Sequence, residues 1–86
     1  MGRPEEAQTY FVRALEIREK VLGPEHPDTA TSLNSLGALL NEMGRFEEAQ
    51  TYFVRALEIR EKVLGPEHPD TARVRQLLRA ISEKSR

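Results

Sequence analysis

The chain has 86 residues, 31% of them charged, and a formal net charge of −1, which allows one domain with a thin core. It contains no cysteine, so disulfides, thiolate nucleophiles and cysteine–zinc sites are excluded. No stretch approaches the ~20 apolar residues of a membrane helix and no apolar segment follows Met1, so a cytoplasmic protein without a membrane partner is expected.

The sequence contains a near-perfect internal repeat. Residues 43–72 repeat residues 1–30 at an offset of 42, and the two copies differ only where Phe46 replaces Pro4. Self-similarity at such a period is typical of helical repeat arrays. A recent duplication and an engineered consensus array both produce identity of this kind, and the sequence is compatible with either origin.

Apolar periodicity predicts four helices, over residues 4–22, 28–43, 46–64 and 70–84. No segment alternates apolar and polar residues, so strands are not expected and the fold class is all-α. The helix over 46–64 carries two adjoining apolar stripes, as expected for a helix packed between neighbours. The first stripe comprises Phe46, Ala49, Phe53, Ala56 and Leu57, and the second comprises Tyr52, Ala56, Ile59 and Val63.

Glycine and proline mark the ends of these helices. Gly23 and Gly65 can adopt the left-handed conformation just past a last turn, and the proline after each prevents the helix from continuing. The next helix starts at an HPD tripeptide, whose proline suits a first helical position. Asp28 and Asp70 then either cap the helix or complement its dipole.

The last helix differs from its counterpart at the positions that would pack on a following helix. Its apolar residues form a single compact stripe of Val74, Leu77, Leu78 and Ile81. At the offset of 42, the apolar or small residues Leu33, Gly37 and Leu40 are replaced by Arg75, Arg79 and Ser82. A repeat stack needs a terminal element with one polar side, so this helix is predicted to be a cap.

This pattern resembles the tetratricopeptide repeat, in the 42-residue variant of kinesin light chains and related bacterial repeat proteins. The resemblance implies a short right-handed solenoid of antiparallel helix pairs, as one domain over residues 1–86. It also implies that Gly37 and Ala49 are small so that paired helices can approach closely. The matching residues are Leu33, Leu36, Gly37, Leu40, Gly44, Phe46, Ala49, Phe53, Ala56 and Leu57.

Members of this family bind peptides in a concave groove, which the resemblance places on the second helix. The implied function is a non-catalytic scaffold whose partner is a protein or peptide. The candidate groove residues are Thr31, Asn34, Ser35, Ala38, Asn41 and Glu42.

No pattern in the sequence points to catalysis, a metal or a cofactor. The HPD motif at His26 and His68 also occurs in DnaJ-type co-chaperones, but a plain helix start explains it here. Two histidines so far apart are a poor metal site, because zinc takes at least three protein ligands. Acidic residues that could be taken for acid–base pairs fall on first helical turns, where they favour the dipole. These residues are Glu5, Glu6, Glu47 and Glu48.

Charge is unevenly distributed and raises one alternative function. Residues 1–72 carry 8 basic and 13 acidic groups, whereas residues 73–86 carry 5 basic groups and one acidic group. A basic end can bind nucleic acid. No aromatic residue lies between these cations to stack on bases, so a solvated outer face is the favoured explanation. The cations are Arg73, Arg75, Arg79, Lys84 and Arg86.

The first helix is predicted to mediate self-association. The chain starts at Met1-Gly2-Arg3, the counterpart of the turn Met43-Gly44-Arg45, so the helix over 4–22 lacks the helix that would precede it in a full repeat. An uncovered apolar face of this kind favours a homodimer. The two chains could pack these faces together, or they could exchange helices by a domain swap that opens the Met43-Gly44-Arg45 turn. The residues of the face are Ala7, Tyr10, Phe11 and Ala14.

Overall fold

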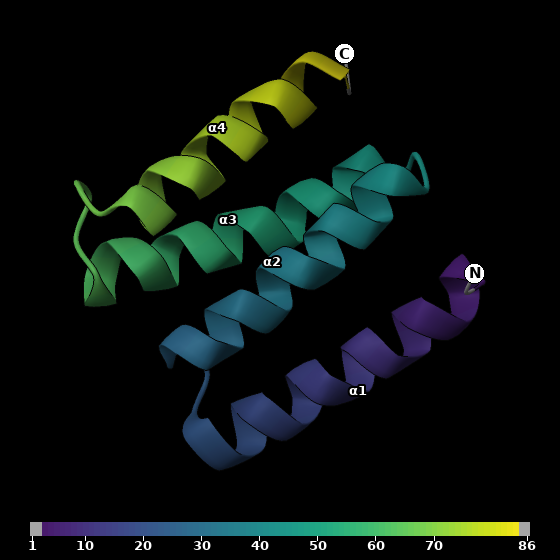
Figure 1. Cartoon of the computed structure of the whole chain (residues 1–86), viewed down its shortest axis with the longest axis horizontal. Coiled ribbons are helices and arrows are strands. Elements are labelled where there is room, and N and C mark those ends of the chain that lie inside the picture. The colour runs from purple at the N-terminus through teal and green to yellow at the C-terminus, as the bar shows by residue number, and fades with distance from the viewer. Residues whose placement is uncertain (1–2, 85–86) are drawn as a thin grey trace.

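The computed structural model describes residues 3–84; Met1, Gly2 and Arg86, named above, lie outside the described residues. It contains the helices α1 (Pro4–Leu22), α2 (Pro27–Glu42), α3 (Phe46–Val63) and α4 (Pro69–Lys84). No strand occurs among the described residues, and the all-α prediction is confirmed. Each helix packs antiparallel against the next, which leaves α1 and α4 at the two outer edges (Figure 1).

The starts of α2 and α4 differ from the expectation by one residue. Both helices begin at the proline of the HPD tripeptide, and the histidine before it acts as the cap. His26 Nδ1 accepts a hydrogen bond from the Asp28 backbone N–H at 3.0 Å, and His68 Nδ1 accepts one from Asp70 at 3.1 Å. Because the histidines are the caps, Asp28 and Asp70 do not cap these helices. They lie in the first turn, where their charge complements the helix dipole.

The glycine after α1 has a positive φ, as expected, but it is not left-handed helical. Gly23 has φ 100° and ψ 157°, so the backbone turns outward in an extended conformation. Its carbonyl accepts a hydrogen bond from the Thr29 hydroxyl at 2.8 Å, which ties the connection to the first turn of α2. Only glycine adopts this backbone region without strain.

The core lies mainly between α2 and α3. From α2 it takes Leu33, Leu36 and Leu40, which are fully buried. From α3 it takes the buried residues Ala49, Phe53, Ala56 and Ile59. The predicted second stripe of α3 is wrong at its end: Val63 is exposed, and its counterpart Val21 in α1 is exposed as well, so the buried stripe stops at Ile59.

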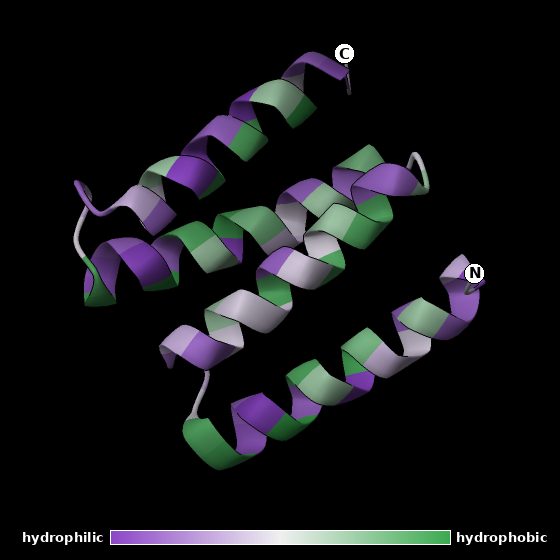
Figure 2. Cartoon of the chain, viewed as in Figure 1, coloured by the Kyte–Doolittle hydropathy of each residue, from purple (hydrophilic) through white to green (hydrophobic). Residues whose placement is uncertain are grey.

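The outer helices attach to this pair in different ways. On one side, Leu15 of α1 is buried, and the Arg18 guanidinium donates to the Asp28 carbonyl and the Ser32 hydroxyl of α2 at 3.0 and 2.9 Å. On the other side, Val74 and Ile81 of α4 are buried against α3. Figure 2 shows that much of the rest of α4 consists of hydrophilic residues.

Candidate interaction surface

The two copies of the repeated helix have the same residues in different environments. Phe53 in α3 is fully buried, whereas Phe11, its counterpart in α1, exposes 37% of its surface. Ile59 is 6% exposed, and its counterpart Ile17 is 58% exposed. The difference arises because α2 packs on this face of α3. The same apolar face on α1 is therefore open to solvent.

Two hollows adjoin Phe11, and small side chains make up part of the lining of each. One hollow, of about 190 Å³, is lined by Phe11, Ala14, Arg18, Ser32 and Ser35. The other, of about 340 Å³, is lined by Phe11, Ser35, Ala38, Leu39 and Glu42. Because residues of both α1 and α2 line them, the hollows form one shallow surface between the two helices, named here the Phe11 trough.

The trough brings together residues from both sequence-predicted sites. Ser35, Ala38 and Glu42 of the candidate groove and Phe11 and Ala14 of the candidate association face lie along it. The groove and the association face are thus adjacent parts of one surface.

The other candidate groove residues lie outside the trough lining. The Thr31 hydroxyl bonds to the Pro27 carbonyl of its own helix at 3.2 Å. Asn34 and Asn41 are partly buried, and the Oδ1 atom of each is buried without a hydrogen-bond partner among the described residues. These two amide oxygens are therefore shielded from solvent.

The two remaining residues of the association face differ in exposure. Tyr10 exposes 69% of its surface and lies at the border of the face. Ala7 is partly buried near the start of α1. Phe11 is therefore the centre of the exposed apolar face, with Ala14 beside it.

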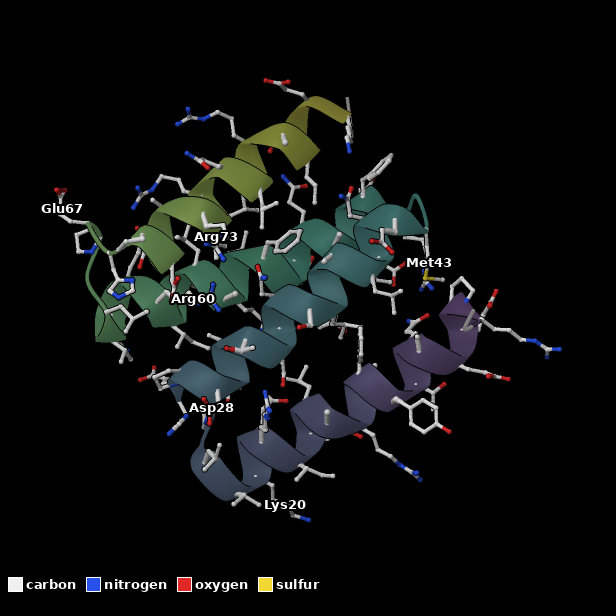
Figure 3. All side chains as sticks on the ribbon, viewed as in Figure 1. Lys20, Asp28, Met43, Arg60, Glu67 and Arg73 are labelled. Atoms are coloured by element: carbon white, nitrogen blue, oxygen red, sulfur yellow. The ribbon has the colours of Figure 1, made fainter. Side chains whose placement is uncertain are left out.

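Ion pairs join the two copies along the other side of the molecule. Arg55 of α3 pairs with Glu19 of α1 at 2.7 Å, and Lys62 pairs with Glu25 at 2.8 Å. The counterparts of the two cations in α1 are Arg13 and Lys20, and neither has an ion-pair partner among residues 3–84. Figure 3 shows Lys20 on the edge of α1 that faces away from α2.

Two ion pairs, Arg45–Glu48 and Lys62–Glu25, shift the pKa values of Arg45, Glu48 and Lys62. Arg45 donates two hydrogen bonds of 2.7 Å to the Glu48 carboxylate, which lower the pKa of Glu48 and raise the pKa of Arg45. The bond from Lys62 to Glu25 raises the pKa of Lys62. The same Arg45 also donates to Gln8 Oε1 at 2.9 Å, so it links the α2–α3 turn to α1.

Sequence reasoning missed several residues that shape this surface. Leu39, Ser32 and Arg18 line the trough, although the predicted sites did not include them. The copy-to-copy ion pairs were also missed. Opposite charges that recur 36 or 37 residues apart, close to the repeat length, were a usable indication of them.

Two further features are absent from the described part of the chain. No group of three or more histidine, aspartate or glutamate side chains within residues 3–84 could hold a metal ion. No described helix is both long and apolar enough to span a membrane.

Comparison with known proteins agrees with the arrangement of paired, duplicated helices. The model of the tetratricopeptide repeat family matches residues 1–62 and, in a second overlapping match, residues 32–78. No curated protein matches the chain. Repeats of this family are generally non-catalytic modules for protein interaction. The chain belongs to the tetratricopeptide repeat family.

Proposed function

We propose that the chain is a non-catalytic, minimal repeat scaffold that self-associates through the apolar face of α1, formed by Ala7, Tyr10, Phe11 and Ala14. The contrast between exposed Phe11 and buried Phe53, in otherwise identical helices, carries the proposal. Because burial of Phe53 stabilises the second copy, burial of Phe11 should stabilise the first copy in the same way. Fully burying a large apolar side chain contributes about 1.5–3 kcal/mol, and about a third of the Phe11 surface remains to be buried.

The same face of a second copy is the simplest cover. A two-fold axis brings each patch onto itself, so every contact formed is formed twice. The small residues beside Phe11 leave space for an incoming aromatic ring, because Ala14, Ser32 and Ser35 line the hollow next to it. The candidate groove adjoins this face, so a peptide bound along Ser35, Ala38 and Glu42 would compete with the second copy.

Light scattering from micromolar to millimolar concentration tests the proposal. We expect a dimer mass that falls to the monomer mass on dilution. Phe11→Glu should give a monomer that keeps its helical circular dichroism. The control is Val54→Glu, which places the same charge on an apolar residue of α3 that is 43% exposed, and it should still dimerise. A monomer mass for the parent chain at all concentrations would refute self-association.

A domain swap that opens the Met43–Arg45 turn gives a different result. The swapped dimer does not use the Phe11 face, so Phe11→Glu would leave its mass unchanged. That outcome would keep self-association and reject the α1 face as its site.

Nucleic-acid binding by α4 is the weaker proposal, because two of its cations, Arg75 and Lys84, have other partners. Arg75 pairs with Glu61 at 3.5 Å and donates to the Pro66 carbonyl at 3.1 Å, and Lys84 lies over the Phe46 ring at 5.7 Å. Binding to generic DNA with a steep salt dependence would favour it. Absence of such binding at low salt would reject it.

A further inference from the structure

We propose that the Phe11 trough accepts an amphipathic α-helix with the residue pattern of α2, supplied by another polypeptide. The inference rests on the proposed function in one respect, that the α1 face is a binding surface. It goes further by naming the chemistry of the preferred occupant: leucines at three positions and a glycine opposite the aromatic ring, in the order Leu-x-x-Leu-Gly-x-x-Leu.

The second repeat provides the first argument, because it holds the same face in its covered state. Residues 47–63 are identical to residues 5–21, and they are covered by α2. The buried residues of α2 include Leu33, Leu36, Gly37 and Leu40, and Gly37 lies against the Phe53 ring of this face. A face with identical residues in an identical helical conformation presents the same shape and the same apolar groups to a partner.

The contact between Gly37 and Phe53 sets the most demanding feature of the occupant. A Cβ atom on residue 37 would lie 3.0 Å from Cδ1 and Cε1 of the Phe53 ring. A contact this short is tighter than nine in ten real Cβ contacts, so a side chain there would force the ring to shift, and glycine is the residue that fits without a shift. Phe11 imposes the same requirement on whatever packs closely against α1.

The shape of the trough gives an independent argument for a helix in this place. The hollows beside Phe11 have walls from α1 and from α2, and the α2 wall consists largely of small side chains, Ser32, Ser35 and Ala38. A rod-shaped partner can therefore contact both helices at once. A second copy of α1 presents Phe11 itself, and no glycine, to the opposing ring, so it cannot approach as closely as a helix of the α2 type.

A peptide of residues 26–43, labelled at its N-terminus and titrated with the full-length chain, tests the inference. Fluorescence anisotropy should show saturable 1:1 binding, and circular dichroism should show a gain of helix, because an isolated peptide of this length is only marginally helical. If the parent chain is a dimer, the peptide should convert it to a complex of one chain and one peptide.

Two variants make the test specific. A peptide with Gly37→Leu should bind about tenfold more weakly or worse, because the leucine side chain overpacks the contact with Phe11. The chain with Phe11→Glu should lose binding of the parent peptide, whereas Val54→Glu should retain it. Retained binding by Phe11→Glu would mean that the peptide replaces α2 on α3, and it would overturn the inference.

The remaining outcomes separate this inference from the proposed function. No saturable binding up to millimolar chain, or equal binding of the two peptides, would overturn the trough as a helix site. A dimer that the peptide leaves intact would reject the inference and keep self-association. A chain that is monomeric at all concentrations and binds the peptide with the expected specificity would support the inference and reject self-association.

Discussion

Gly37 of α2 lies directly against the ring of Phe53 of α3, with the nearest ring carbons 3.0 Å from where a Cβ atom would be. The resemblance to the tetratricopeptide repeat implies that Gly37 and Ala49 are small so that the paired helices can approach closely. The structure shows that the Phe53 ring occupies the space that a side chain on residue 37 would need. An aromatic ring and a glycine are thus a matched pair across the main helix contact.

Replacing Gly37 by leucine should destabilise the fold by about 1–3 kcal/mol or more, because the added side chain has no space beside Phe53. Urea denaturation followed by circular dichroism measures this. Ala80→Leu, an exposed alanine-to-leucine change on α4, is the control and should stay within about 0.5 kcal/mol of the parent. Equal stability of Gly37→Leu and the parent would contradict the packing described here.

Two phenylalanines in identical helices should respond differently to the same substitution. Phe53→Ala should cost about 3–5 kcal/mol, because it leaves a cavity in the core. This is a large part of the stability of a small domain. Phe11→Ala should cost less, about 1–2 kcal/mol at concentrations where the chain is monomeric, since more than a third of this residue's surface is already exposed. Similar costs for the two variants in denaturant melts would show that α1 is covered in solution.

This comparison also shows what sequence alone could predict. Periodicity, glycine and proline identified four helices, because burial and backbone geometry act within a few residues of each position. Phe11 and Phe53 lie in identical stretches, residues 5–30 and 47–72, so only their order in the chain distinguishes them. The hollows of the trough were not predicted, because they depend on how α1 lies against α2 and on side chains from both helices.

Histidine is an uncommon helix cap, and its role here is testable by substitution. His26→Ala and His68→Ala should each cost about 0.5–2 kcal/mol, because the backbone N–H groups of Asp28 and Asp70 lose their acceptors. Asparagine has an oxygen that can accept the same bond, so His26→Asn should be close to the parent in thermal melting. If the alanine and asparagine variants have the same melting temperature, the hydrogen bonds of the histidines contribute nothing measurable to stability.

The Arg45–Glu48 pair predicts a change in titration behaviour. Because Arg45 lowers the pKa of Glu48, the pair stabilises the folded chain above the ordinary glutamate pKa, and this contribution is lost as the pH falls through the lowered value. Arg45→Ala should raise the Glu48 pKa toward its usual range. Carbon-detected NMR titration of the Glu48 carboxyl measures it, and an unchanged midpoint would show that the pair does not form in solution.

The last prediction concerns the replacements that make α4 a cap. Arg75→Leu, Arg79→Gly and Ser82→Leu together would give α4 the Leu-x-x-Leu-Gly-x-x-Leu pattern of α2, with Leu78 already in place. In the parent helix, two of these positions make polar contacts. Arg75 pairs with Glu61, and Ser82 Oγ accepts a hydrogen bond from Gln50 Nε2 at 3.0 Å.

If the Phe11 trough accepts a helix of this pattern, the altered α4 of one chain should bind the trough of the next. Such a head-to-tail contact does not close on itself, so it should produce chains of increasing length. We expect light scattering of the triple variant to rise steadily with concentration, with helical circular dichroism retained. Adding Phe11→Glu to the triple variant should stop the growth, because it removes the acceptor. Growth that continues would show that the exposed leucines associate without using α1, and a triple variant that behaves like the parent would contradict the assignment of α4 as a cap.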